Sequence, residues 1–383
     1  MSSASSEGAA RVLFIFGTRP EAIKLAPVIS TMRSRPSEFR VSVCVTSQHR
    51  EMLDQALPVF GIQPDFDLDL MRPDQTLSDL TARILHALPP VLRQLQPDWA
   101  IVQGDTTTTL SAALCAFYHR VPVAHIEAGL RTGHLDAPFP EELNRRAVDL
   151  FAGLCFAPTE RAAECLRSEG VAEERIHVTG NTGIDAILKA VEFPCELRSG
   201  PLAELDDERE LVLVTTHRRE SFGAPLQDIC RGIREIAARH AKRVQFVLPV
   251  HPNPNVAEPI RSELGAIQNV LLVEPIDYVP FAHLIARARI VLTDSGGIQE
   301  EAASLGKPVL VMRERTERPE GIDAGCATLV GRDPARIASA VDQLLTDPAA
   351  YEKMAVPTLV YGDGRASERI CEAITCAHRR ATG

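Results

Sequence analysis

A strand, a turn and a helix follow one another directly in Val291-Leu292-Thr293-Asp294-Ser295-Gly296-Gly297-Ile298-Gln299-Glu300-Glu301. Residues 289–292 form a short run rich in β-branched residues, which predicts a buried strand. Residues 298–305 predict a helix, ended by glycine and followed closely by proline. The turn between them has two interpretations. It is a tight turn capped by Asp294 or Ser295, or its glycines and the helix N-terminus form a phosphate site, with Glu301 binding ribose hydroxyls.

The same alternation of strand and helix extends outward in both directions. Predicted strands cover residues 12–16, 41–45, 99–102, 121–126, 154–157 and 175–179, and then 211–215, 244–248, 270–273, 289–292 and 309–312. A polar segment, residues 194–210, separates the two series and has the composition of a linker. The fold class is therefore α/β, with two doubly wound, Rossmann-like domains and a cleft between them.

Composition limits the class of protein. The chain has 383 residues, 45% hydrophobic and 24% charged, which is typical of a water-soluble protein with two domains. A net charge of -10 argues against nucleic acid and anionic membranes as partners. The nine cysteines are scattered without a CxxC pair, and no apolar run reaches membrane length. We expect a cytoplasmic protein without a metal site.

Polar residues gather where predicted strands end, which is where open α/β sheets bind ligands. After the first strand there is no GxGxxG, but two cations, Arg19 and Lys24, stand near a helix start. Each candidate also has a structural interpretation: surface charge for the cations, helix capping or a favourable helix dipole for the acids, and a turn for the histidines. The candidates at the other strand ends and the next helix start are Asp105, Glu127, Glu141, His217 and His251.

Six longer motifs carry a resemblance. In chain order they are Phe16-Gly17-Thr18-Arg19-Pro20-Glu21-Ala22, Gly104-Asp105-Thr106-Thr107-Thr108-Thr109, His125-Ile126-Glu127-Ala128-Gly129-Leu130-Arg131, Pro138-Phe139-Pro140-Glu141-Glu142, His217-Arg218-Arg219-Glu220-Ser221-Phe222 and Asp294-Ser295-Gly296-Gly297-Ile298-Gln299-Glu300-Glu301. The set resembles the non-hydrolysing UDP-N-acetylglucosamine 2-epimerases. The resemblance implies a fold like that of GT-B glycosyltransferases, a homodimer, a UDP-sugar substrate and no external redox cofactor.

The resemblance also implies domain limits and residue roles. An N-terminal domain, residues 1–190, would include the C-terminal helix 366–383, and residues 208–365 would bind UDP. Matching catalytic positions are Asp105, Glu127, Glu141 and His217. Matching substrate-binding positions are Arg19, Lys24, Phe281, Ser295, Gly296, Gly297, Glu301 and Arg318. Gln48, Arg218 and His251 match a second, allosteric sugar-nucleotide site of some members, whereas Glu51 and Asp74 depart from it.

The expected chemistry is interconversion of UDP-N-acetylglucosamine and UDP-N-acetylmannosamine. Because the C2 proton is not next to a carbonyl, elimination of UDP to 2-acetamidoglucal and its re-addition is the expected route. Such a route needs an acid, a base and cations for the departing diphosphate. Three alternatives remain: a retaining glycosyltransferase, an epimerase that hydrolyses its substrate or accepts a modified UDP-N-acetylhexosamine, and a non-catalytic sensor that would not need the three carboxylates.

Overall fold

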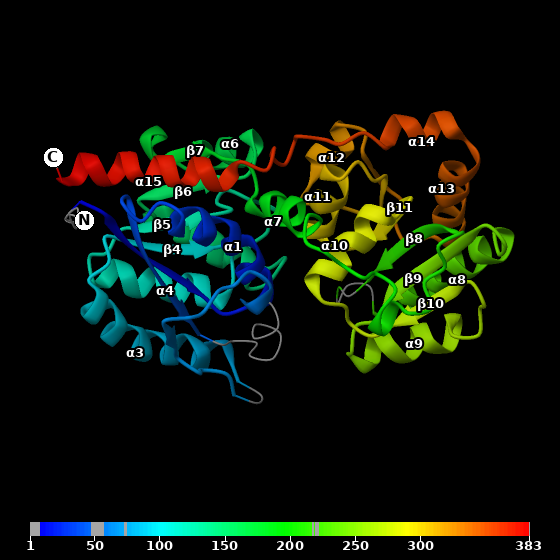
Figure 1. Cartoon of the computed structure of the whole chain (residues 1–383), viewed down its shortest axis with the longest axis horizontal. Helices are drawn as coiled ribbons and strands as arrows, with labels where there is room; N and C mark the ends of the chain where they lie inside the picture. Colours follow the sequence, from blue (N-terminus) through cyan, green and yellow to red (C-terminus); the bar gives the residue numbers. More distant parts are fainter. Residues whose placement is uncertain (1–7, 47–56, 73–74, 217, 219–221, 383) are drawn as a thin grey trace. The chain divides into compact units, whose positions relative to one another are not determined.

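The computed structural model describes residues 8–46, 57–72, 75–216, 218 and 222–382. The chain divides into two compact units, each with its own sheet (Figure 1). The first unit comprises Met1–Ala186 and Gly362–Gly383, and the second comprises Ile187–Tyr361. Within the part described, no helix is long and apolar enough to cross a membrane.

The first unit contains a parallel sheet of seven strands in the order β3-β2-β1-β4-β5-β6-β7. The order reverses between β1 and β4, and polar groups that follow these two strands come together there. The strands are β1 Ala10–Phe16, β2 Phe39–Val45, β3 Phe66–Asp67, β4 Trp99–Gln103, β5 Val123–Ile126, β6 Leu154–Ala157 and β7 Ile176–Val178.

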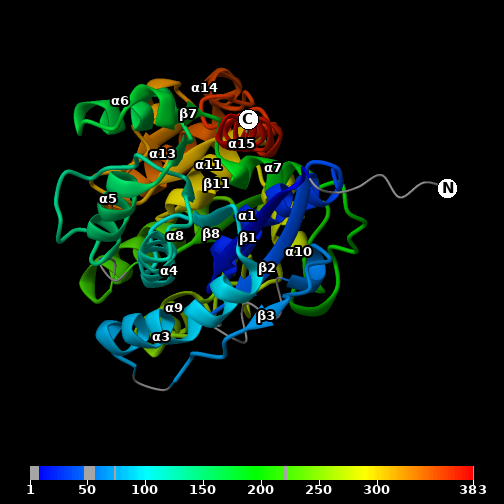
Figure 2. The ribbon, with the colours of Figure 1, turned by 90° about the vertical axis from the view of Figure 1, so that its left-hand side faces the viewer.

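Helices cover both faces of this sheet, so its strands are apolar on both sides. Along β1, Phe14 packs into a cluster with α1 and α15, whereas Leu13 and Ile15 pack with α3 and α4 on the other face. In Figure 2, α4 lies between α3 and α5. The helices are α1 Arg19–Arg33, α3 Leu77–Leu95, α4 Thr107–Tyr118, α5 Glu141–Phe151, α6 Glu160–Ser168 and α15 Ala366–Thr382, with a short 3-10 helix η1 Glu173–Arg175. Helix α7 Thr182–Ala190 begins in this unit and ends in the second.

The last helix belongs to the first unit although it ends the chain. Figure 1 shows α15 (red) beside α1, which it contacts. Its start is held by Asp185, whose carboxylate accepts from the backbone N–H groups of Ala366 at 3.2 Å and Ser367 at 2.8 Å. The first N–H groups of a helix lack partners within the helix, and this carboxylate satisfies two of them. Ile370 and Ile374 then pack against the sheet.

The second unit repeats the design with six parallel strands in the order β10-β9-β8-β11-β12-β13. Its switch point lies between β8 and β11. The strands are β8 Glu210–Thr215, β9 Val244–Pro249, β10 Val270–Val273, β11 Ile290–Thr293, β12 Val309–Val311 and β13 Ala327–Leu329. The helices are η2 Gly200–Leu202, α8 Ala224–Arg239, α9 Pro254–Leu264, α10 Tyr278–Arg287, α11 Gly296–Ser304, α12 Pro319–Asp323, α13 Pro334–Thr346 and α14 Pro348–Met354.

The predicted fold class is confirmed, with local differences. The helix predicted at 298–305 begins two residues earlier, at Gly296, so the two glycines lie in its first turn and not in the preceding loop. Its end is as predicted, because Gly306 has a positive φ of 69°. The two-residue strand β3 and the three-residue strand β13 are too short to leave an apolar pattern in the sequence.

Candidate functional site

Glu127 occupies an unusual backbone conformation directly after β5. Its φ is +66°, in the left-handed region that side chains other than glycine adopt rarely. The carboxylate is buried and accepts from Lys24 Nζ at 2.7 Å and 2.6 Å. Gln103 and Asn181 also donate to it. The sequence predicted Lys24 as a substrate contact, and in this structure the ammonium group is paired with Glu127.

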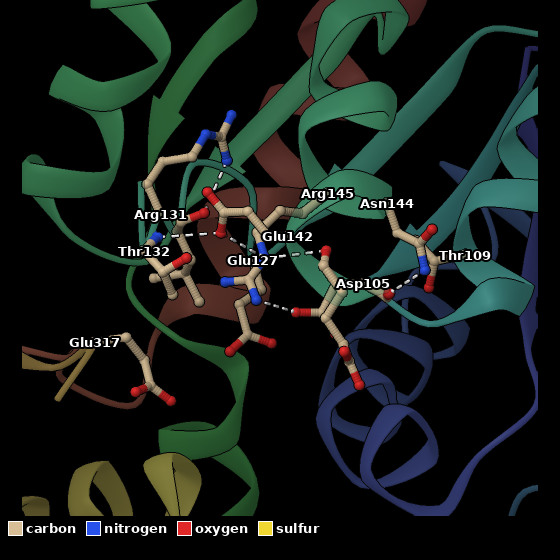
Figure 3. A network of polar contacts seen from close by, with 12 residues as sticks. Asp105, Thr109, Glu127, Arg131, Thr132, Glu142, Asn144, Arg145 and Glu317 are labelled. Atoms are coloured by element: carbon tan, nitrogen blue, oxygen red, sulfur yellow. Dashed lines mark hydrogen bonds and ion pairs between the residues drawn. The ribbon is translucent and has the colours of Figure 1, made fainter. Parts of the chain in front are cut away.

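Asp105 follows β4 and is held by two residues of α5. Asn144 Nδ2 donates to its backbone oxygen at 2.8 Å, and the Arg145 guanidinium lies 3.0 Å from Oδ2 (Figure 3). Burial raises the pKa of Asp105 above its ordinary value; Arg145 opposes this shift, and the carboxylates of Glu127 and Glu141 add to it. The side chain still exposes 31% of its surface, so it is accessible to a ligand.

Asp105 is not the cap of the helix that follows it. The N-cap of α4 is Thr106, whose hydroxyl accepts from the backbone of Thr109 at 3.1 Å. The structural interpretation of Asp105 as an N-cap is therefore wrong, and the carboxylate is left to face Arg145.

Two adjacent acids at the start of α5 have different environments. Glu142 is fully buried and accepts from the backbone N–H of Thr132 at 3.1 Å, which fixes the preceding loop (Figure 3). Glu141 Oε2, by contrast, is a buried oxygen without a hydrogen-bond partner among the described residues. Because a buried polar atom without a partner is costly, Glu141 is the acid here that is suited to meet a ligand.

Sequence reasoning missed Glu21, which joins the loops at the switch point. Its carboxylate accepts from the backbone of Thr18 at 2.8 Å and from the hydroxyls of Thr106 at 2.8 Å and Thr109 at 3.1 Å. Burial raises the pKa of Glu21, whereas these hydrogen bonds lower it. The pattern Thr18-x-x-Glu21 is a capping box, which is the signal that identifies it from sequence. Asn181 and Arg145 left no comparable pattern.

In the second unit, α11 presents its N-terminus directly after β11. The first N–H groups of such a helix have no partner within it and favour anions. Asp294 does not cap α11, because its Oδ2 accepts from Thr216 Oγ1 at 3.0 Å and Arg218 N at 3.1 Å. Ser295 occupies the N-cap position without a side-chain cap bond. Asp294 is therefore not the cap, whereas Ser295 is the N-cap residue by position but its side chain accepts no cap hydrogen bond, so α11 begins without a side-chain cap bond from either residue.

Glu301, one turn into α11, accepts from Tyr278 Oη at 3.2 Å. The half-buried Phe281 lies on the same helix as Tyr278, α10. Arg318 is buried and pairs with Glu300.

A carboxylate lies beside the first residue of α11. Glu317 is paired with Arg218 at 3.0 Å and with Arg313 at 2.5 Å, and Arg318 lies 3.9 Å away. Burial opposes ionisation, but these three guanidinium groups lower the pKa of Glu317 to about 2. A Cβ added at Gly296 would lie 3.0 Å from Glu317 Oε1. The carboxylate of Glu317 therefore places a negative charge next to the start of α11.

The remaining candidates are less informative. Gln48 and His217 lie outside the described residues, as do Glu51 and Asp74. Arg19 is the first residue of α1 and is half-buried. His251 is exposed after β9, where Nδ1 accepts from Asn253 N at 3.1 Å, so it forms part of a turn.

The arrangement in the first unit is suited to proton transfer. It combines a carboxyl group with a raised pKa, a carboxylate paired with lysine and an acid with an unpartnered buried oxygen. Among the residues the structure describes, no group of three or more His, Cys, Asp or Glu side chains is placed to hold a metal ion.

Comparisons with known proteins identify the family of this chain. A family model described as "UDP-N-acetylglucosamine 2-epimerase" matches residues 31–375. A Yersinia pestis protein named UDP-N-acetylglucosamine 2-epimerase is 53% identical over 371 residues, covering 95% of this chain and 98% of that protein. The structure of UDP-GlcNAc 2-epimerase from Neisseria meningitidis bound to UDP-GlcNAc has a TM-score of 0.88 and 45% identity, covering 95% of this chain and 99% of that one.

A more distant structure extends the same likeness. UDP-GlcNAc 2-epimerase from Methanocaldococcus jannaschii, in complex with UDP-GlcNAc and UDP, has a TM-score of 0.80 and 32% identity, with 96% of this chain and 99% of that one covered. Fold and sequence thus agree over nearly the whole chain. This chain is an isomerase that belongs to the UDP-N-acetylglucosamine 2-epimerase family.

Proposed function

We propose that this protein reversibly epimerises UDP-N-acetylglucosamine at C2 and does not release the free sugar. The observation that supports this most directly is the set of three acids, Asp105, Glu127 and Glu141, around the carboxyl ends of β4 and β5. A glycosyltransferase that shares the fold would have no need of three acids in this unit. The named relatives act on or bind the same nucleotide sugar.

The proposed reaction is elimination followed by re-addition. A carboxylate removes the C2 proton, the electron pair of the C2–H bond forms the C1–C2 double bond, and the C1–O bond to UDP breaks. The products in the site are 2-acetamidoglucal and UDP. UDP then adds back to C1 while a proton reaches C2 from the other face. Neither step needs an oxidant or a reductant, so the proposal includes no redox cofactor.

The three acids differ in the properties that these steps require. Asp105 has a raised pKa, so it carries an exchangeable proton closer to neutral pH than an ordinary aspartate. Glu141 supplies an oxygen that has no hydrogen-bond partner in the part of the chain that the structure describes. Glu127 is oriented by its ion pair with Lys24. If substrate binding separates this pair, both charged groups can contact the substrate. In the second unit, His217 and the start of α11 are proposed to bind the departing diphosphate. In the first unit, Arg19 is proposed as a substrate contact.

Nuclear magnetic resonance in D₂O tests the proposal. We expect UDP-N-acetylmannosamine with deuterium at C2, and traces of UDP and 2-acetamidoglucal. Asp105→Asn and Glu141→Gln should each lower exchange and epimerisation together by about 10²–10⁴-fold. Product with only protium at C2 would refute the elimination route. Stoichiometric free N-acetylmannosamine would place the protein among hydrolysing epimerases, and UDP release that depends on an acceptor would identify a glycosyltransferase.

We also propose a homodimer that uses the outer face of α4 and α5. Phe117, Tyr118, Leu143 and Leu150 expose 53%, 68%, 48% and 73% of their surfaces on these two neighbouring helices. A group of large exposed apolar side chains is typical of an interface. In sedimentation experiments, Leu150→Asp should weaken the dimer, whereas Leu359→Asp, at a residue also 73% exposed in the second unit, should not. A monomeric wild type at micromolar concentration would refute this interface.

We further propose that two residues, Arg218 and His251, belong to a regulatory site. Arg218 is paired with Glu317, and His251 is exposed at the end of β9. If they bind a second sugar nucleotide, Arg218→Ala and His251→Ala should abolish activation by substrate while leaving UDP binding at α11 measurable by calorimetry. Hyperbolic kinetics in the wild type would exclude this role.

A further inference from the structure

His125 is a buried histidine that the proposed reaction does not use. It lies on β5, two residues before Glu127, and no part of it is exposed. Its Nε2 lies 2.7 Å from the backbone oxygen of Gly104, and its Nδ1 lies 2.6 Å from Asp149 Oδ1. Both contacts have the length of strong hydrogen bonds.

The partners of His125 determine its protons. A carbonyl oxygen can only accept, so Nε2 must donate to Gly104. Nδ1 then either donates to an ionised Asp149 or accepts from a protonated one. The other oxygen of Asp149 accepts from Gly129 N at 3.1 Å and from Arg131 at 2.7 Å, which favours the ionised carboxylate. Although burial opposes ionisation, the contacts that Asp149 makes with His125 and with the guanidinium of Arg131 lower its pKa. Both nitrogens of His125 therefore donate.

The pair connects the loops that carry the acids. Gly104 precedes Asp105, and Gly129 follows Glu127 by two residues. Asp149 lies on α5, the helix that starts at Glu141 and whose residues 144 and 145 contact Asp105. His125 and Asp149 thus join the end of β4, the loop after β5 and α5 through three hydrogen bonds.

We propose that His125, as an imidazolium ion paired with Asp149, is a positioning residue that sets the spacing of the proposed acids. It does not transfer protons itself, because the side chains of His125 and Asp149 are 0% and 1% exposed and cannot meet a substrate. The proposal rests on the proposed function. Its physical reason is that elimination and re-addition need groups fixed on two faces of one sugar ring, and a displacement of about 1 Å can cost about 10²-fold in rate.

Asp149→Asn separates charge from geometry. An asparagine can accept from Gly129 and Arg131 with its oxygen and donate with its nitrogen to Nδ1 of a neutral His125, whose Nε2 still donates to Gly104. His125→Gln removes the ring. The matched control is His177→Gln: His177 lies on β7, is half-buried beside Phe156, and its pKa is lowered by burial.

The first readout is ¹⁵N resonance of labelled histidine side chains in the full-length protein. The His125 signal is assigned by its loss in His125→Gln, or by its change in Asp149→Asn if the first variant does not fold. At pH 7.5 we expect both ring nitrogens of His125 to be protonated in the wild type. In Asp149→Asn, one nitrogen of His125 should be unprotonated, as should one nitrogen of His177 in the wild type. An unprotonated His125 nitrogen in the wild type would overturn the charged pair. This readout does not depend on the reaction.

The second readout is kinetic. His125→Gln should lower kcat and C2 exchange in D₂O by about 10–10²-fold, and Asp149→Asn, which keeps the hydrogen bonds but not the charge, should lower both by less, with KM changed less than about threefold and the control unaffected. Normal kcat per folded molecule combined with a lower melting temperature would reduce the pair to a structural role and overturn the proposal. If the wild type itself shows no C2 exchange, the proposed function fails, while the ¹⁵N result still decides the protonation of His125.

Discussion

Glu127→Gln tests the centre of the proposed site. The substitution keeps the size and left-handed backbone of the residue but removes the charge that faces Lys24. These side chains expose only 6% and 20% of their surfaces. Breaking a buried ion pair costs about 3–5 kcal/mol, and we take the lower end because the glutamine oxygen can still accept from Lys24. For a domain of about 150–250 residues this corresponds to a melting temperature about 6–12 °C lower.

Activity should fall by more than stability explains. If Glu127 is an acid or base, epimerisation and C2 exchange fall by about 10²–10⁴-fold at a temperature where the variant is fully folded. Calorimetry and proton resonance in D₂O supply the two measurements. The matched control is Glu192→Gln, which removes an exposed pair with Lys189 at the similar distance of 2.7 Å and should cost under about 1 kcal/mol. Normal exchange in folded Glu127→Gln would refute the catalytic role of this residue.

Three further substitutions probe the second unit. Gly296→Val places a Cβ 3.0 Å from Glu317 Oε1, so this ion-paired carboxylate must shift slightly while the second unit stays folded. UDP binding should weaken more than about tenfold because the new side chain blocks the start of α11; unchanged affinity in calorimetry would remove this turn from the site. Glu317→Gln should strengthen UDP binding because it removes a negative charge beside the start of α11, and unchanged or weaker binding would contradict this. Because the pKa of Glu317 is about 2 when folded against an ordinary 4.5, its stabilisation is present above about pH 4.5 and is lost as pH falls towards 2; the variant should flatten this part of a stability–pH curve measured by denaturant unfolding. Tyr361→Phe removes the acceptor for Gly321 N at 2.8 Å and should cost about 1–3 kcal/mol without changing UDP affinity, whereas an unchanged melting temperature would contradict this.

The sequence by itself determined the class of fold and the main candidate residues. Strands such as residues 270–273 are short apolar runs between helices with clear ends, and a pattern of this kind is local. Asp105 and Glu127 were found because acids at the carboxyl ends of parallel strands meet at one edge of a sheet, whatever the details of packing. Gly306 ended its helix as predicted, since a positive φ is a property of that residue and its neighbours alone.

Tertiary structure decided which of these residues are paired, buried or left without a partner. The sequence gives no distance between Lys24 and Glu127, which are 103 residues apart and form an ion pair. It also does not distinguish Glu141 from Glu142, because only the folded loop supplies partners to the second. His125 stands on an apolar strand like any core residue, and only the fold brings Gly104 and Asp149 within hydrogen-bond distance of its two nitrogens. Hydrogen bonding and desolvation depend on neighbours in space, so only the tertiary structure fixes them.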